Sequence, residues 1–174
     1  SSGLETITIF PGRDSTREQR RLFVPDLARE IAGIEGVQAA TPVNQAGFTV
    51  VAGREVYQTQ VIGSDDRLPR IFDLEIADGR GLTAADSQRR SPVAVLGAEL
   101  ADKLFPLGGA VGSYVRLSSR RVSRSVKVVG ILAAHSDALG FSFDTTAYIP
   151  YRTLTEDEFR QAQKTLREKF PDCE

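Results

Sequence analysis

The sequence contains few of the residue types from which metal sites and disulfide frameworks are built. Its 174 residues include one histidine, His135, and one cysteine, Cys173, and there is no tryptophan or methionine. A structural zinc site needs about four Cys or His ligands, so this pair cannot form one. A single cysteine also cannot form an internal disulfide bond. We therefore expect no metal ion, no cofactor and no disulfide staple.

Carboxylates are the remaining ligands for a hard cation. The candidates are Asp65, Asp66, Asp137 and Asp144. Each is expected in a loop, where solvated acids are the usual finding, and no loop of the calcium-binding type is present. These residues are therefore interpreted as solvated acids.

An excess of charge of one sign is absent as well. There are 22 Lys and Arg residues against 23 Asp and Glu residues, for a net charge of −1. A dedicated nucleic-acid binder would show a basic excess. The charge balance therefore argues against nucleic acid as a partner.

Long hydrophobic runs are missing too. No stretch approaches the ~20 consecutive apolar residues of a membrane-spanning helix. The start of the sequence also lacks the basic segment and apolar core of a signal peptide. We expect these residues to be soluble on their own, and a soluble piece of a membrane protein fits equally well.

Catalytic constellations are not apparent. His135, Ser136 and Asp137 are consecutive in the sequence, and neighbouring residues cannot aim all their side chains at one reacting atom, as a hydrolase triad must. There is no G-x-S-x-G motif. His135 is interpreted as a loop residue after a strand, and the sequence predicts that the chain is not an enzyme.

A segment that begins like a nucleotide-binding turn is present at residues 93–106, VAVLGAELADKLFP. It reads as a buried strand, one glycine and the start of a helix. A phosphate-binding loop needs several glycines, often with a lysine, so that consecutive backbone N–H groups can approach the anion. Gly97 is alone and Lys103 lies inside the helix, so Gly97 is interpreted as a strand-to-helix corner.

Hydrophobic periodicity and turn residues predict an α+β chain. Helices are expected over residues 26–33, 98–105 and 155–170, with short helical turns at 68–72 and after Thr83. Strands are expected over residues 4–10, 48–51, 55–63, 91–97, 112–119, 124–132 and 145–151, and a further short strand is expected to start at Leu74 and run into Asp78 and Gly79. Turns are expected at residues 45–47 and 52–55, and a polar hairpin loop at 119–124. The order of elements does not alternate as in a doubly wound parallel sheet.

Capping patterns support two of the helices. Thr83 and Asp86 are spaced as a capping box, and so are Thr155 and Glu158. The helix after Thr155 carries an apolar stripe at helical spacing and is the strongest helix signal in the chain.

The most visible charge feature is a basic cluster in the predicted hairpin: Arg116, Arg120, Arg121, Arg124 and Lys127. In the plainer interpretation, the arginines keep a strand edge from pairing with another chain. In the alternative, they contact an acidic partner or anionic head groups.

Several motifs, in a fixed order, resemble a known family. They are Gly79, Arg80, Leu82 and Asp86; Val93–Gly97, Ala101, Leu104 and Phe105; Val111, Gly112, Val115 and Leu117; Val128–Leu132; and Pro150, Tyr151 and Thr153. Upstream, LETITIFPG and IAGIEGVQAATPV also fit. The chain resembles the MacB-like periplasmic core domain of ABC transporter permeases, a group that includes FtsX-like and lipoprotein-releasing permeases.

The resemblance implies a chain with two lobes. Residues 1–41 and 151–174 would form a membrane-proximal α/β lobe, called porter-like in this family. Residues 42–150 would form a distal, mostly β lobe, called sabre-like.

The resemblance also implies a function. The domain would stand outside the inner membrane, facing the periplasm, and would transmit ATP-driven motion in export, efflux or lipoprotein release. Its partners would be a cytoplasmic ATP-binding subunit or domain, a second permease copy and, as a further candidate, a periplasmic adaptor protein. The full-length protein would be anchored in the membrane.

Two polar regions are the candidate contact sites for such partners. One is the arginine-rich hairpin with Arg120, Arg121 and Arg124, and the other is the loop that begins with Asp65, Asp66 and Arg67. Both are expected to project from the distal lobe.

Other functions compete with this interpretation. One alternative is a free-standing extracytoplasmic module that binds a small ligand or peptide, for example as a sensor, in a cleft between the lobes. Another is an enzyme that uses carboxylates such as Asp137 and Asp144.

Overall fold

The computed structural model describes residues 7, 9, 25–135, 142–155 and 158–162. The predicted first strand, residues 4–10, falls almost entirely outside the described residues, as do residues 163–170 of the predicted last helix. The rest of the chain forms a mixed α/β structure built on a seven-stranded sheet.

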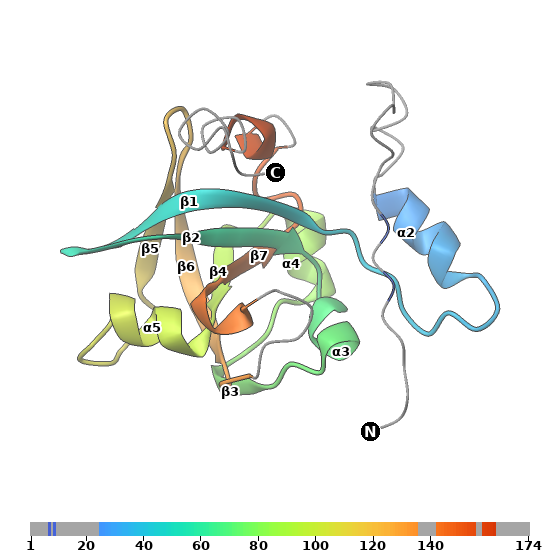
Figure 1. Cartoon of the computed structure of the whole chain (residues 1–174), viewed down its shortest axis with the longest axis horizontal. Helices are drawn as coiled ribbons and strands as arrows, with labels where there is room; N and C mark the ends of the chain where they lie inside the picture. Colours follow the sequence, from blue (N-terminus) through green and yellow to red (C-terminus); the bar gives the residue numbers. More distant parts are fainter. Residues whose placement is uncertain (1–6, 8, 10–24, 136–141, 156–157, 163–174) are drawn as a thin grey trace.

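The sheet closes on itself to form a barrel (Figure 1). Its strands are β1 (Asn44–Ala52), β2 (Glu55–Ser64), β3 (Ile76–Gly79), β4 (Val93–Leu96), β5 (Tyr114–Ser118), β6 (Ser123–Leu132) and β7 (Ala147–Pro150). The order is β3-β6-β4-β7-β2-β1-β5, and β5 also pairs with β6. That extra pairing joins the two sides of the sheet, so every strand except β3 belongs to a closed ring.

Neighbouring strands of the ring form both antiparallel and parallel pairs. β1 and β2 form an antiparallel hairpin, as do β5 and β6. β2 with β7 and β4 with β6 are parallel pairs. The two predicted hairpins are therefore confirmed, while the closure and the parallel pairs are properties of the tertiary structure.

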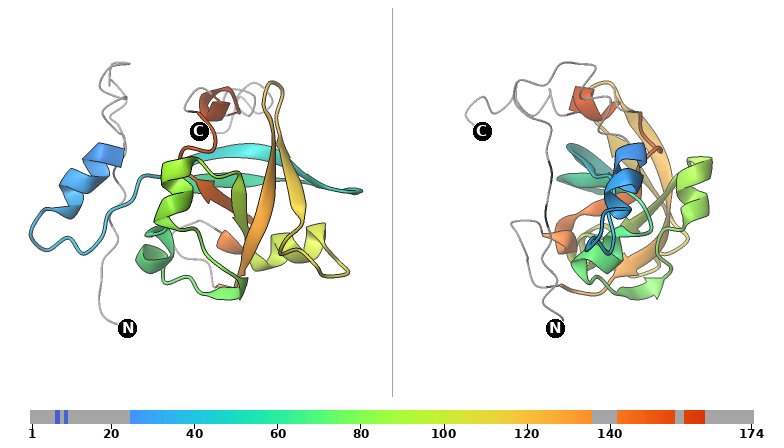
Figure 2. Two further views of the ribbon diagram at one scale, coloured as in Figure 1. Left: turned by 180° about the vertical axis from the view of Figure 1, so that it is seen from behind. Right: turned by 90° about the vertical axis from the view of Figure 1, so that its right-hand side faces the viewer.

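Short helices connect the strands. They are α3 (Leu68–Phe72), α4 (Ala84–Arg89) and α5 (Ala98–Leu104), with a 3₁₀ turn at Phe143–Thr145. The helix α2 (Pro25–Ala32) precedes the barrel. Figure 1 and the left view of Figure 2 show it beside the barrel, joined to β1 by a connecting segment. A helical stretch over residues 158–162 follows β7.

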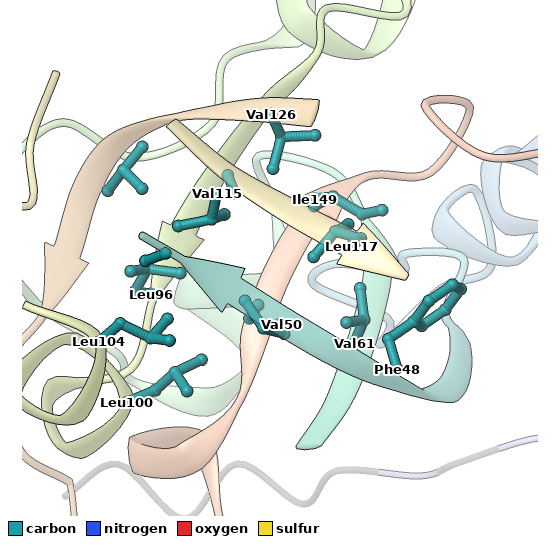
Figure 3. Close-up of a cluster of buried hydrophobic side chains, with 14 of the residues drawn as sticks. Phe48, Val50, Val61, Leu96, Leu100, Leu104, Val115, Leu117, Val126 and Ile149 are labelled. Atoms are coloured by element: carbon teal, nitrogen blue, oxygen red, sulfur yellow. The ribbon is translucent and has the colours of Figure 1, made fainter. Parts of the chain in front are cut away.

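The barrel interior is one hydrophobic core, and Figure 3 shows its side chains converging from several strands. Val50, Leu96, Leu117 and Ile149 are fully buried there. Leu100 and Leu104 of α5 join the same core. Alternate residues of β1 and β5 are buried, because successive side chains of a strand point to opposite faces and one face lies against the core.

A second core covers the outer face of the barrel at β2, β4 and β7. Val95 and Tyr148 point to this side, where Leu68, Leu74 and Leu82 cover them. Strands buried on both faces read as continuous apolar runs. This explains why the segment VAVL of β4 carries no polar residue.

The structure corrects two details of the sequence prediction. Residues 45–47 were expected in a turn, but β1 starts at Asn44 and pairs with β2 through that stretch. The local Gly47 signal is overridden by cross-strand pairing. The polar loop expected over residues 119–124 is shorter, because β6 begins at Ser123 and Val122 is buried.

The two-lobe division remains a prediction. Leu154, Phe159 and Ala162, which the sequence placed in the first lobe, pack in the core inside the barrel. The described part of the C-terminal segment is therefore integrated with the strands.

Candidate functional site at the entry and exit of the barrel

The chain enters and leaves the barrel at the same end. Asn44 at the start of β1 pairs with Gly63 near the end of β2, and Ser64 pairs with Pro150 at the end of β7. The Tyr151 N–H then donates to the Ser64 carbonyl oxygen at 2.6 Å. We call residues 41–44 with 64–67 the entry junction, and residues 151–155 and 158–162 with Arg124 the exit junction.

The entry junction is built around the carboxylate of Asp65. The Thr41 hydroxyl donates to Asp65 Oδ1 at 2.6 Å, and Arg67 donates to the same carboxylate from its backbone N–H at 3.0 Å and from Nη2 at 2.5 Å. The Ser64 hydroxyl donates to the Pro42 carbonyl oxygen at 2.9 Å. These bonds attach the incoming segment to the end of β2.

Burial and hydrogen bonding oppose each other at Asp65. Burial disfavours the charged carboxylate, but the hydrogen bonds from Arg67 and Thr41 outweigh it and hold the pKa of Asp65 below its usual value. Underneath, the Tyr148 hydroxyl donates to the Asp65 carbonyl oxygen at 3.0 Å. Burial, followed by the nearby Asp65 charge, raises the pKa of Tyr148 above its usual range. Asp65 is therefore an ionised, internally satisfied group.

Among the described residues, the incoming side adds no side chain to the two hydrophobic cores of the barrel, although Ala28 of α2 is itself buried. Ile34 and Val43, which precede the barrel, are 58% and 48% exposed. Within the described part of the chain, the side-chain contacts that join the incoming segment to the end of β2 are polar.

The exit junction combines an ion pair with a helix cap. Arg124 Nη2 lies 2.8 Å from Glu158 Oε1. The Thr155 N–H donates to Glu158 Oε2 at 2.7 Å, and the Glu158 N–H donates to Thr155 Oγ1 at 3.2 Å. This reciprocal pair confirms the predicted capping box. Burial would raise the pKa of Glu158, but the bonds from Thr155 and Arg124 hold it below its usual value.

Aromatic packing also closes the exit junction. Phe159 is 2% exposed and meets Phe48 of β1 edge to face, with ring centroids 6.3 Å apart. A Cβ atom at Gly63 would lie 2.8 Å from Phe159 Cζ, so the glycine leaves room for the ring. The outgoing segment is thus part of the barrel core.

The motif Gly79–Asp86, on which part of the family resemblance rests, has a clear physical role. Gly79 has φ +70°, and a Cβ there would lie 2.2 Å from the Val129 carbonyl oxygen. Arg80 Nη1 then donates to Asp86 Oδ2 at 2.8 Å, and the same oxygen accepts the Thr83 N–H at 2.9 Å. These contacts fasten β3 and α4 to β6, and the capping box at Thr83 is confirmed.

Gly97 also makes a close backbone approach. It caps α5, and its N–H donates to the Thr146 carbonyl oxygen at 2.8 Å. A Cβ at this position would lie 2.0 Å from the Phe143 carbonyl oxygen. The predicted strand-to-helix corner is confirmed, and residues 143–146 occupy the space in front of it.

The predicted contact residues are distributed unequally. Arg120 and Arg121 lie in the β5–β6 turn and are exposed, but Arg124 lies within β6 and pairs with Glu158. Asp66 is exposed and Arg67 is half-buried. Asp65 was expected to project, but it is only 7% exposed. Its hydrogen bonds within the chain explain its burial. Partner binding by these residues remains a prediction.

Sequence reasoning missed Thr41, Ser64 and Phe159 as junction residues. Thr41 and Asp65 are 24 positions apart, and Arg124 and Glu158 are 34 apart. No local spacing rule connects such pairs. The only usable signals were the Asp65–Arg67 spacing and the Thr155–Glu158 capping pattern.

The described residues hold no group of three or more His, Cys, Asp and Glu side chains placed to bind a metal ion. The helices among them are also too short or too polar to cross a membrane. His135, as predicted, lies in a loop after β6, where its N–H donates to Asp144 Oδ1 at 2.9 Å. What the site does is hold two chain segments to one end of a barrel.

Comparison with known proteins decides the family. The profile of the MacB-like periplasmic core domain matches residues 1–168. The chain belongs to this family. It is therefore classed with the extracytoplasmic domains of MacB-like ABC transporter permeases, which confirms the resemblance found in the sequence.

Curated relatives are larger export proteins. The chain is 28% identical over 128 residues to the pyoverdine export ATP-binding/permease protein PvdT of Pseudomonas fluorescens, covering 72% of the chain and 19% of that protein. It is 25% identical over 155 residues to the macrolide export ATP-binding/permease protein MacB of Marinobacter nauticus, covering 87% of the chain and 23% of that protein. The chain thus spans about a fifth of the length of these relatives.

Solved structures share the fold. The periplasmic region of MacB from Actinobacillus actinomycetemcomitans superposes with a TM-score of 0.61 at 20% identity, covering 72% of the chain and 54% of that structure. The extracellular domain of the transporter YknZ from Gram-positive bacteria gives 0.59 at 19% identity, covering 84% and 81%. Both are extracytoplasmic domains, as the family assignment requires.

Proposed function

We propose that the MacB-like domain transmits motion from an ATP-driven permease to substrate or partner proteins outside the inner membrane. It acts in export, efflux or lipoprotein release and makes or breaks no covalent bond itself. The observation that carries the proposal is the contrast between the junctions. The exit segment is packed into the barrel, whereas polar contacts hold the entry segment.

This contrast suits a rigid body that moves about one of its connections. A closely packed core transmits strain, so a displacement of the outgoing segment carries the barrel with it. Hydrogen bonds at Asp65 can exchange with water when the incoming segment rotates. Hinge motions of this kind use a few residues at the ends of elements.

The proposed partners are those that the family resemblance implies. A cytoplasmic ATP-binding subunit or domain supplies the motion, a second permease copy completes a dimer, and a periplasmic adaptor protein is a further candidate. The full-length protein is expected to carry apolar helices of ~20 residues that anchor it in the inner membrane.

Distance measurements in the full-length transporter test the proposal. Spin labels are attached to cysteines at Glu30 in α2 and Gln58 in β2, in a background where Cys173 is replaced by serine. A matched pair at Gln58 and Ser125 lies within the barrel. All three positions are exposed.

We expect the distance between Glu30 and Gln58 to differ between the ATP-free and ATP-bound transporter, while that between Gln58 and Ser125 stays constant. Equal distances in both states for the first pair would refute the proposal. So would a full-length gene product without membrane helices.

A further inference from the structure

Charge is segregated on the described surface although the chain as a whole is nearly neutral. There is no Asp or Glu between Asp102 and Asp137, and this stretch contains the whole β5–β6 hairpin. Exposed acids lie elsewhere: Asp66 before α3, Asp73, Glu75 and Asp78 between α3 and the end of β3, and Glu99 and Asp102 on α5. The hairpin side of the barrel therefore carries an acid-poor, basic surface.

The outward faces of β5 and β6 define this surface, which we call the basic wall: Tyr114, Arg116, Ser123, Ser125 and Lys127. All five are exposed, while Val115 and Leu117 between them point into the core. Tyr114, which is 64% exposed, pairs directly with Lys127, and Arg116 pairs with Ser125.

Further cations adjoin the wall at the end of α4. The Lys127 N–H donates to the Pro92 carbonyl oxygen at 2.8 Å, which places the exposed Arg89 and Arg90 close by in the chain. Figure 2 shows α4 and the β5–β6 hairpin on the same face of the molecule, in the view from behind.

Arg116 and Lys127 make no ion pair with any described residue: those seen elsewhere use Arg67, Arg80, Lys103 and Arg124. Arg120 and Arg124 are left out of the wall, because both already interact within the chain.

The register sets the spacing of the two central cations. Arg116 and Lys127 are diagonal neighbours on adjacent antiparallel strands. Such neighbours lie about 7–8 Å apart. Alternate residues of an extended peptide lie about 6.5–7 Å apart on one face. Carboxylates at alternate positions of an extended segment therefore match the spacing of the two cations, and the hydroxyls of Ser123, Ser125 and Tyr114 can donate to them.

We propose that the basic wall binds an extended acidic segment of a partner protein, with carboxylates at alternate positions facing Arg116 and Lys127. The inference rests on the proposed function, in which the barrel contacts partner proteins. The wall is the side of the barrel, whereas the chain enters and leaves at its end. In the proposed function that end faces the bilayer, so the wall stands upright from the membrane, and we take a protein as its occupant.

A fluorescently labelled peptide of alternating Glu and Thr tests this inference with the purified chain. Binding is followed by fluorescence anisotropy, and a Gln-Thr peptide of equal length is the peptide control. We expect saturable binding of the acidic peptide that weakens as salt is added, because exposed charges are screened. No binding of the acidic peptide, or equal binding of both peptides, would overturn the inference.

Charge reversal identifies the site. R116E/K127E is expected to weaken binding by about tenfold or more, because charge reversal at an interface sets like charges against each other. R116K/K127R should bind within about twofold of the wild type, because both charges remain. The matched control is R70E, which reverses an exposed arginine on α3. Unchanged binding by R116E/K127E would overturn the inference, and circular dichroism checks that each variant is folded.

Vesicles of phosphatidylglycerol and phosphatidylethanolamine provide the competing outcome. Binding of the chain to these vesicles without binding to the acidic peptide would assign the wall to lipid and overturn the inference. The assay needs neither ATP nor a membrane helix. Its failure would leave the label distances of the transporter unaffected, so the two proposals fail separately.

Discussion

The entry and exit junctions attach chain segments to the same end of the barrel by different physical means. At the entry, the buried Asp65 carboxylate accepts hydrogen bonds from Thr41 and Arg67. At the exit, Phe159 and Leu154 pack into the core, and the Arg124–Glu158 pair lies at the surface above them. Water cannot substitute for the contacts between buried apolar side chains, whereas it can take the place of a hydrogen-bond donor or acceptor. The comparison therefore predicts a firm exit and a releasable entry.

The largest effect is expected from truncating the exit. Phe159→Ala removes a buried ring and should lower the free energy of unfolding by about 3 kcal/mol. Ile34→Ala, on the exposed entry side, should change it by less than about 0.5 kcal/mol. Urea unfolding followed by circular dichroism measures both, since the chain has no tryptophan. Equal effects of the two substitutions would abolish the distinction between the junctions.

The entry carboxylate should produce the next effect. Asp65→Ala leaves the Thr41 hydroxyl and the Arg67 backbone N–H without their acceptor, and we expect a loss of about 2 kcal/mol. The entry segment should also become accessible, so amide exchange at Thr41, Val43 and Asn44 should accelerate while that in β4 stays slow. Unchanged exchange at the entry in a folded Asp65→Ala variant would show that other contacts hold the segment.

Acid should weaken the entry junction. The pKa of Asp65 is lowered in the folded state from an unfolded value near 3.9. Its contribution to stability is therefore complete above the unfolded pKa and is lost as pH falls through the folded pKa. Asp65→Asn should be less stable at neutral pH and lose less stability on acidification below about pH 5. Asp86 and Glu158 also have lowered pKa values, so they account for the loss of stability in acid that remains in the Asp65→Asn variant. Parallel pH profiles for the two proteins would contradict this role.

The smallest effect is expected at the exit ion pair. Glu158→Gln keeps a side chain that can complete the capping box but removes the charge that faces Arg124. Because Arg124 is half exposed, the loss should stay under about 1 kcal/mol. A double-mutant cycle with Arg124→Gln measures the coupling directly. A coupling larger than the Phe159→Ala effect would mean that charge, and not packing, closes the exit.

Local sequence signals predicted caps, turns and corners well where the structure depends only on residues close together in the sequence. The capping boxes at Thr83 and Thr155, the turn at Gly53–Arg54 and the corner at Gly97 are all confirmed. The wrong turn at residues 45–47 shows the limit of this reasoning. There, pairing with β2 stabilises an extended backbone that the Ala-Gly signal alone does not favour.

The candidate site was less predictable for the same reason. Asp65 and Arg67 could be found because they are two residues apart, but their burial depends on Thr41 and Tyr148, which come from distant parts of the chain. The basic cluster was visible as a run of arginines. Only the strand register separated Arg116 and Lys127 on the wall from Arg124 at the exit junction.

The sequence by itself predicted most of the described strands, the two capping boxes and the family resemblance, because these depend on neighbours within a few residues. The tertiary structure alone decided that β5, besides its predicted hairpin partner β6, also pairs with β1, so that the sheet closes into a barrel. It also decided that the chain enters and leaves at one end. Barrel closure joins segments far apart in the chain, and the free energy of such contacts depends on the whole core.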